Sequence, residues 1–159
     1  MMVKIQPVTP TDKAWLTQFV MAQWGGEIVV AHGVIYYPAE LPGFVARLAD
    51  EVVGLVTYVM AEGACEIVTI DAIRPFQGIG TLLLAAVKAE AVQAGCRRLW
   101  LITTNDNLAA LRFYQRRGFV LAALHRNALA LSRQIKPQIP LIGMDGIPLR
   151  DELELEMAL

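Results

Sequence analysis

The stretch from residue 64 to residue 119 constrains the fold of this chain more than any other. It opens with an apolar run rich in β-branched residues, Ile67 to Ile73, which is typical of a buried strand. The chain then turns through Gly78-Ile79-Gly80 into a segment with the apolar spacing of one helix face, and Gly95 ends it. The apolar positions of that face are 79, 82, 83, 86 and 87. A second apolar run, Leu99 to Ile102, follows at once, so the order strand, turn, helix, strand predicts a right-handed βαβ unit with parallel strands.

The glycine turn before the helix also has a chemical use. Two glycines let the backbone come close to a ligand, and the first N–H groups of a helix have no acceptor inside the helix. Together with the helix dipole they favour an anion, for which phosphate is the usual choice. Glycines also open helices for packing reasons alone. The two-glycine pattern by itself leaves these interpretations evenly matched.

The second half of the stretch carries a more specific pattern. The segment Asn107-Leu-Ala-Ala-Leu-Arg-Phe-Tyr-Gln-Arg-Arg-Gly-Phe119 resembles the N-x-x-A-x-x-x-Y-x-x-x-G-F signature of the GNAT superfamily of acyl-CoA-dependent N-acetyltransferases. In that family a strand with polar or acidic residues, a glycine turn and this helix occur in the same order, and the resemblance covers roughly residues 44 to 119. It implies a mixed α/β, GNAT-like fold with a central, mostly antiparallel sheet, one parallel strand pair and flanking helices.

The resemblance also implies an acetyl-CoA site, with one departure from the family pattern. The family's Arg or Gln three places before the first glycine falls on Pro75, and Gln77 stands next to the glycine instead. The link from Ile73 to Gly78 is also short for the family. The residues that the resemblance assigns to acetyl-CoA are Ala72, Ile73, Gln77, Gly78, Ile79, Gly80, Thr81, Asn107 and Tyr114.

Length and composition set the remaining bounds. With 159 residues the chain is predicted to form one domain, residues 1–159, with a sizeable core. Its longest apolar stretch, Val52 to Ala61, is interrupted by polar residues and glycine and is far shorter than the roughly 20 residues that span a bilayer. The first ten residues lack the apolar core of an export signal, so we expect a cytoplasmic protein that does not bind membranes. The net charge of −1 gives no reason to expect a nucleic-acid partner.

Cysteine usage and apolar content add two expectations. Cys65 and Cys96 lie at or beside the starts of predicted strands without metal-ligand spacing, which indicates buried free thiols in a reducing compartment and no metal site. Hydrophobic residues make up 55% of the chain, which leaves room for a self-association surface, and a homodimer stays open.

The rest of the chain divides into short elements. Extended segments are predicted at 3–8, 28–30, 34–37, 44–48, 52–60, 120–124 and 151–159, with a kink at His32-Gly33 and turns at Asp50-Glu51 and Glu62-Gly63. One helix is predicted from near Pro10 to Gly25-Gly26, with Thr9 or Thr11 as its cap and with Trp15, Phe19 and Ala22 on one face. A second helix is predicted over 128–135. The loop from Lys136 to Arg150 is either functional or an ordered crossover that packs Ile139, Leu141 and Ile142.

Acetyl transfer from a thioester to an amine needs a neutral amine, a donor for the oxyanion and a proton for the departing thiolate. Tyr114 suits the last role, because a phenol with a pKa of about 10 is protonated at pH 7 and can donate. The competing interpretation is a core tyrosine. By resemblance Asn107 binds the pantetheine arm and the N–H of Ile73 or a neighbour stabilises the oxyanion, although Asn105, Asp106 or Asn107 can equally cap the helix.

For the base, the resemblance favours Glu66, since the family often places a glutamate on the central strand. Strand alternation predicts Glu66 and Asp71 on opposite faces, so that only one of them reaches the acceptor. His125 ranks third, and a water chain without a fixed base stays open. His32 is either a base or substrate contact or, more typically for a histidine beside glycine, a turn residue. The carboxylates of 151–159 either attract a cationic amine or line a solvated sheet face.

These observations predict an N-acetyltransferase that moves an acetyl group from acetyl-CoA to a primary amine by direct attack. Its acceptor is a small molecule or a peptide. The alternative is a non-catalytic acyl-CoA-binding or regulatory GNAT-like domain. A nucleotide-binding α/β module ranks third, because Thr81 follows the glycines without a lysine and the third fingerprint glycine is missing.

Overall fold

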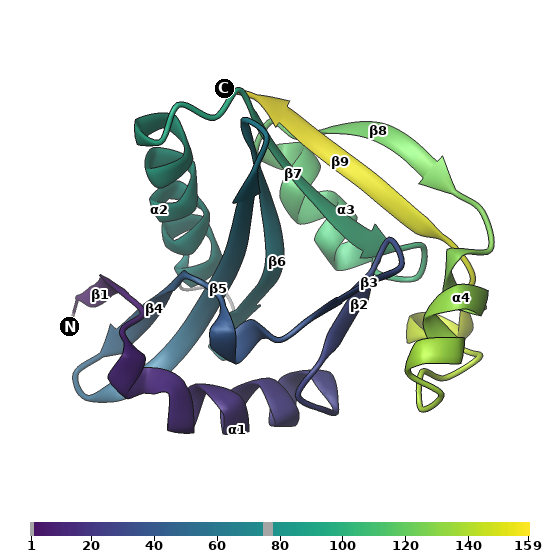
Figure 1. Ribbon diagram of the computed structural model, residues 1–159, viewed down its shortest axis with the longest axis horizontal. Helices are drawn as coiled ribbons and strands as arrows, with labels where there is room; N and C mark the ends of the chain where they lie inside the picture. The colour runs from purple at the N-terminus through teal and green to yellow at the C-terminus, as the bar shows by residue number, and fades with distance from the viewer. Residues whose placement is uncertain (1, 75–77) are drawn as a thin grey trace. The chain divides into compact units, whose positions relative to one another are not determined.

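The structure, a computed structural model, describes residues 2–74 and 78–159, and Figure 1 labels its helices and strands. Its contacts divide into a first unit of residues 1–29, 37–99 and 159 and a second unit of residues 30–36 and 100–158. The strands are β1 (Val3–Pro7), β2 (Val29–Ala31), β3 (Val34–Tyr36), β4 (Gly43–Leu48), β5 (Glu51–Ala61), β6 (Ala64–Ala72), β7 (Arg98–Thr104), β8 (Val120–His125) and β9 (Glu152–Ala158). The helices are α1 (Lys13–Trp24), α2 (Ile79–Gln93), α3 (Leu108–Arg116) and α4 (Ala128–Ile135), with short 3-10 turns at Pro10–Asp12, Pro38–Glu40 and Met144–Gly146.

In the first unit, β1, β4, β5 and β6 are neighbours in that order, and each pair is antiparallel. The two β-hairpins turn through residues with positive φ, at Ala49 (55°) and at Glu62 and Gly63 (53° and 77°). Such left-handed turn residues match the right-handed twist of hairpin strands. The predicted antiparallel hairpin is confirmed, with its turn at Ala49-Asp50 rather than at Asp50-Glu51, and the predicted turn into β6 is confirmed.

Helices α1 and α2 cover opposite faces of these strands. Leu55 of β5 packs against Leu16 and Val20 of α1. At the preceding residue, Gly54, an added Cβ would lie 2.7 Å from Ile79 of α2. Because successive strand residues point to opposite faces, α1 covers the side of Leu55, which we call the α1 face, and α2 covers the other side. Figure 1 shows the two helices beside these strands.

For some residues at the edges of the apolar faces of these two helices, the predicted burial is wrong. In α1 the fully buried residues are Leu16 and Val20, while Ala22 is exposed. In α2 Leu82 is 42% exposed and Leu84 is buried. A residue at the border of an apolar stripe fits the helical spacing on either side, and the tilt of the helix on the sheet decides which border is covered.

In the second unit, β9 lies between β7 and β8, and β8 and β9 are antiparallel. The predicted helix over 128–135 is confirmed with the same bounds. The predicted kink is the turn of the β2–β3 hairpin, where His32 and Gly33 have φ of 41° and 77°.

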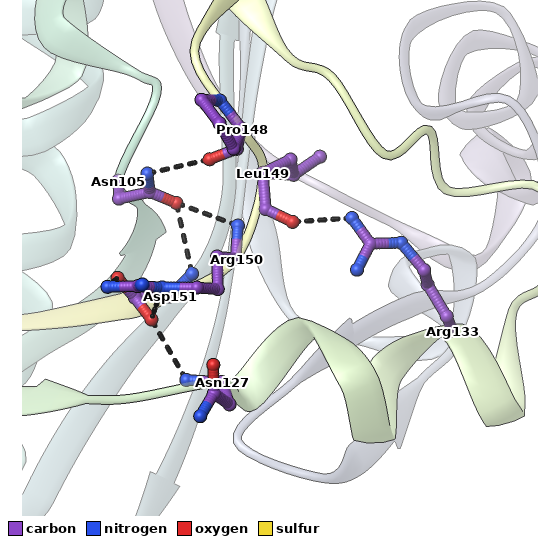
Figure 2. A network of polar contacts seen from close by, with 7 residues as sticks. All are labelled: Asn105, Asn127, Arg133, Pro148, Leu149, Arg150 and Asp151. Carbon is purple, nitrogen blue, oxygen red and sulfur yellow. Dashed lines mark hydrogen bonds and ion pairs between the residues drawn. The ribbon is translucent and has the colours of Figure 1, made fainter.

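The loop from 136 to 150 is ordered by polar contacts, as Figure 2 shows. The Asn105 side chain accepts hydrogen bonds from the N–H groups of Arg150 and Asp151, each at 3.0 Å, and donates one to the carbonyl of Pro148 at 2.9 Å. Asp151 accepts hydrogen bonds from the Arg150 side chain and, at 2.9 Å, from the N–H of Asn127. These contacts fix the start of β9 beside the end of β7.

A second anchor of this loop comes from α4. The Arg133 guanidinium donates to three loop carbonyls, those of Ile139, Pro140 and Leu149. The order of the loop therefore agrees with the crossover interpretation. Its predicted packing is wrong for Leu141 and Ile142, which are 71% and 57% exposed, because backbone carbonyls rather than apolar side chains hold the loop.

The predicted fold class is confirmed: mixed α/β, with a sheet that is mostly antiparallel and contains one parallel pair, and with flanking helices. The assignment of residues 1–159 to a single domain stays a prediction. Over residues 2–74 and 78–159, no helix is long and apolar enough to cross a membrane.

Candidate active site

The start of α2, which follows β6 in the chain, has the geometry of an anion cradle. Strand β6 ends at Ala72, and Gly78 caps α2 with a φ of 71°, a left-handed conformation that favours glycine. The space where a Cβ of Gly78 would stand is open. The N–H of Leu82 donates to the carbonyl of Gly78 at 3.0 Å, and the N–H groups in the first turn of a helix point toward its N-terminal end, where they favour an anion. The predicted contact of Gln77 lies outside the described residues.

The other residues expected in this cradle differ in exposure. The Ile79 side chain is 1% exposed and lies against Gly54 of β5, so only its backbone can face a ligand. Ala72, Ile73, Gly78 and Thr81 are exposed, and Gly80 is half-buried in the first turn of α2.

The oxyanion donor expected from the resemblance is the N–H of Ile73 or a neighbour, and the strand pairing indicates which of them is available. The N–H of Ile73 donates to the carbonyl of Val53 at 2.8 Å, so it is already used in the pairing with β5. In an antiparallel ladder the N–H groups of one strand point alternately toward the partner strand and away from it. The N–H of Ala72 therefore points away from β5, and Ala72 replaces Ile73 as the candidate donor.

The two acidic residues of β6 lie on one face. Asp71 pairs with Leu55 of β5, and Glu66 pairs with Val59, four residues further along β5. Residues directly opposite each other in a ladder share a face, so both carboxylates lie on the α1 face. The predicted opposite placement is wrong because Val68 is an extra residue, a β-bulge that resets the alternation.

The environments of the two carboxylates differ. Glu66 is 5% exposed, whereas Asp71 is half-buried near the end of β6. Trp24, the last residue of α1, donates its Nε1–H to Oδ2 of Asp71 at 2.9 Å. Burial raises the pKa of Asp71, and the hydrogen bond from Trp24 opposes that shift in part. Asp71 therefore holds a proton more readily than an exposed aspartate does.

Asn107 and Tyr114 belong to the second unit, at the cap and in the body of α3. The Asn107 Oδ1 accepts the N–H of Ala110 at 3.1 Å, so Asn107 is the helix cap among the three candidates. Tyr114 is 5% exposed, and its ring meets Phe113 and Phe119 edge to face at centroid distances of 5.2 and 5.4 Å. These contacts fix the ring, and the role of the hydroxyl stays a prediction.

Both histidines of the chain lie in the second unit. The His125 Nε2 is 3.0 Å from Oε1 of Glu154 on β9. His32 occupies its hairpin turn, with its Nε2 3.1 Å from the Tyr36 hydroxyl, and its backbone N–H donates to Glu152 at 3.1 Å. Glu152 is only 2% exposed, so the interpretation of this strand as a solvated carboxylate face is wrong at that position.

Sequence reasoning missed Trp24. Its contact with Asp71 joins positions 47 residues apart in the sequence. The helical spacing predicted an apolar face made of other residues of α1. The available signal was a tryptophan in the last turn of the first predicted helix. Such a signal names the region but not the contact.

Two further groups complete the inventory. Cys65 is buried and Cys96 is half-buried, and both are free thiols. Burial raises the pKa of Cys65 to about 12. In the part of the chain that the structure describes, no group of three or more His, Cys, Asp or Glu residues is arranged to hold a metal ion.

Comparison with known proteins gives a consistent result. Residues 12–119 match the family model described as Acetyltransferase (GNAT) family. The chain is 40% identical over 155 residues to the uncharacterized protein YxbD of Bacillus subtilis (strain 168), an alignment that covers 96% of this chain and 97% of that protein.

Solved structures agree in fold. The IAA acetyltransferase from Bacillus cereus ATCC 14579 is similar with a TM-score of 0.73 and 22% identity, over 99% of this chain and 100% of that one. A GNAT family acetyltransferase from Elizabethkingia anophelis, solved with acetyl-CoA bound, is similar with a TM-score of 0.68 and 24% identity, over 99% of this chain and 98% of that one.

Proposed function

The chain belongs to the GNAT family of acetyltransferases, and on that premise we propose that it moves an acetyl group from acetyl-CoA to a primary amine by direct attack. The observation that carries the proposal is the cradle at the start of α2. It combines a left-handed Gly78, open space beyond it and outward-pointing N–H groups, within the residues that match the family. The acetyl-CoA bound in the similar Elizabethkingia protein supports the same ligand class.

The residues proposed to hold acetyl-CoA are the ones that the resemblance assigned in the sequence. Their proposed roles follow from their exposure and their contacts in each unit. In the first unit the backbone of Gly78, Ile79, Gly80 and Thr81 would face the pyrophosphate, with Gln77, Ala72 and Ile73 beside it. In the second unit Asn107 and Tyr114 of α3 would contact the pantetheine arm. The Asn107 Oδ1 already caps α3, so its amide nitrogen is the group proposed to bind.

The reaction divides among three groups of this chain. The N–H of Ala72 is proposed to stabilise the tetrahedral oxyanion, because it points away from β5. A carboxylate on the α1 face of β6 is proposed to accept the amine proton, with Glu66, which the sequence favoured, and Asp71 as the candidates. The Tyr114 hydroxyl is proposed to protonate the departing thiolate.

The test is amine-dependent release of CoA. The protein would be incubated with acetyl-CoA and a panel of small amines and peptides, with CoA thiol measured together with the mass of the acetylated product. We expect thiol release that requires both protein and at least one amine class and matches the acetylated product in amount. Binding of acetyl-CoA without turnover on any amine would instead establish the non-catalytic acyl-CoA-binding alternative.

A further inference from the structure

The contact between Trp24 and Asp71 joins two elements of the first unit at the end of the strand that precedes the cradle. Trp24 is the last residue of α1, and Asp71 is the residue before the end of β6. The indole Nε1–H donates to Oδ2 of the carboxylate at 2.9 Å, and the Trp24 side chain is 37% exposed. The carboxylate is thus held from the side of α1 at a place that solvent still reaches.

Among the described residues of the first unit, few charged groups face Asp71. The charged residue of α1 is Lys13, at the opposite end of the helix, where it pairs with Glu40 at 2.7 Å. On β5 the α1 face presents uncharged side chains, with Leu55 directly opposite Asp71. On β6 the same face carries Glu66, on the far side of the Val68 bulge. The direction in which the pKa of Asp71 shifts is therefore set by burial, which raises it, and by the hydrogen bond from the indole N–H, which lowers it.

We infer that Trp24 is a positioning residue that holds Asp71 as the group that accepts the proton of the acceptor amine, an inference that rests on the proposed acetyl transfer. Asp71 adjoins Ala72, the candidate oxyanion donor, and it is half-buried, whereas Glu66 lies five positions earlier and is nearly covered. A base must reach the amine that attacks the carbonyl, and the position of Asp71 beside that donor suits this task.

With Asp71 as the base, the amine attacks the thioester carbonyl directly. The lone pair of the neutral amine forms the C–N bond, and the carbonyl π pair moves to oxygen. One N–H proton passes to the Asp71 carboxylate, with Oδ2 held by the indole and Oδ1 taking the proton. The C–S bond then breaks as the carbonyl re-forms, and the thiolate takes its proton from the Tyr114 hydroxyl. Asp71 later releases its proton to water, and the Tyr114 phenolate regains one.

Trp24→Phe tests this assignment, because it removes the N–H and keeps an aromatic ring. Loss of a hydrogen bond that favours the ionised carboxylate raises the pKa of Asp71 further. The pH profile of log kcat/KM should bend from a slope of two to a slope of one at that pKa, since the amine itself supplies the other slope. We expect the bend to move to higher pH, by about half to one pH unit for the loss of one hydrogen bond, with the KM for acetyl-CoA unchanged.

Trp15→Phe is the matched control. Trp15 lies on the same helix and its Nε1–H also donates to an aspartate, Asp12, at 2.8 Å. The control loses the same kind of bond and a similar amount of ring surface, and its profile should keep the wild-type bend. An unmoved bend in Trp24→Phe, or an equal shift in Trp15→Phe, would overturn the assignment.

Two more measurements keep the test decisive if Trp24→Phe folds poorly or if no acceptor is found. Asp71→Asn should remove the bend altogether, and a retained bend would overturn the role of Asp71. A carbon NMR titration of the Asp71 carboxyl in wild type and Trp24→Phe needs no substrate. A lower pKa in the wild type supports the positioning role even if the proposed acetyl transfer fails, and equal pKa values reject that role even if the enzyme is active.

Discussion

The carboxylates of Glu66 and Asp71 lie on the same face of β6, although they stand five positions apart in the sequence, an odd spacing that alternation would place on opposite faces. The extra residue Val68 resets the alternation between them, so both side chains face α1. A single strand therefore offers two acids to one side of the sheet. Burial and hydrogen-bond contacts distinguish the two carboxylates, and an isosteric substitution of each one tests which of them takes part in catalysis.

Glu66→Gln and Asp71→Asn should affect kinetics unequally. Glu66 is 5% exposed, so its amide variant should keep the acidic bend of the kcat/KM profile even if the rate falls. Asp71→Asn should lose the bend and lower kcat/KM by about 10²–10⁴, the usual worth of a general base. The pH profiles of kcat/KM for both variants show which substitution has the larger effect. The affinity of each variant for acetyl-CoA is measured beside them, to show that cofactor binding is kept. The reverse order would return the role of base to Glu66.

A carboxylate introduced into the cradle should abolish cofactor binding. Gly80 lies in the first turn of α2, where the helix dipole favours an anionic ligand, and Gly80→Glu places a competing charge and a side chain there. Acetyl-CoA should raise the melting temperature of the wild type, whereas ATP and NAD should not, and the variant should show no shift with acetyl-CoA. Ala130→Glu, an exposed position in the first turn of α4, is the matched control and should keep the shift. A shift with NAD equal to that with acetyl-CoA would contradict the ligand assignment.

The two cysteines should differ in reactivity. Burial raises the pKa of the Cys65 thiol to about 12, so at pH 8 only about one in 10⁴ of these thiols is ionised, while Cys96 is half-buried. A disulfide reagent should label one thiol quickly in the folded protein and both in denaturant. Cys96→Ser should remove the fast reaction, and this variant also lowers the background in assays that count CoA thiols. Fast labelling that persists in Cys96→Ser would show that the buried thiol is accessible.

Helices and turns that depend on local sequence signals were predicted correctly. The helix over 128–135 has strong amphipathic spacing and is followed by Pro137, and both are local signals. The turn at Glu62-Gly63 and the cap at Gly78 follow from the conformational freedom of glycine, which needs no knowledge of the rest of the chain.

Register and long-range contacts were not predictable in the same way. The bulge at Val68 depends on how β6 aligns with β5, and the use of the Ile73 N–H depends on the carbonyl of Val53 across the sheet. The contact of Trp24 with Asp71 needs the end of α1 to reach β6. Each of these is a tertiary fact, and each changes or adds to the candidate site residues that the resemblance and strand alternation had given.

Removal of the Asn105 side chain should loosen the loop from 136 to 150. Asn105 makes three hydrogen bonds to the backbone of Pro148, Arg150 and Asp151 (Figure 2). Because part of this network is exposed, Asn105→Ala should lower the unfolding free energy by about 1–3 kcal/mol rather than by three full bonds. Chemical denaturation measures the loss, and Gln138→Ala, an exposed change in the same loop, should cost much less. Equal losses in the two variants would mean that Asn105 does not hold the loop.

Tyr114→Phe separates an enzyme from a binding module. The substitution removes one oxygen and leaves the ring contacts with Phe113 and Phe119 in place, so the free energy of unfolding should change by about 0.5–1.5 kcal/mol at most. Acetyl-CoA should still raise the melting temperature, because the cradle at Gly78 is untouched. If the hydroxyl protonates the thiolate, kcat should fall by about 10²–10⁴.

The control for this variant is Tyr58→Phe, which removes the hydroxyl of another buried tyrosine, one that stacks on Phe44 in the first unit and is 8% exposed. Its ring surface and burial resemble those of Tyr114, but it lies on the α2 side of β5, paired with Ile67, away from the face that carries Asp71. Turnover should therefore stay near the wild-type value in Tyr58→Phe and collapse only in Tyr114→Phe. A large loss of stability in Tyr114→Phe, with a proportionate loss of activity, would identify its hydroxyl as a tie between structural elements. Unchanged turnover in a stable Tyr114→Phe protein would assign the proton to water.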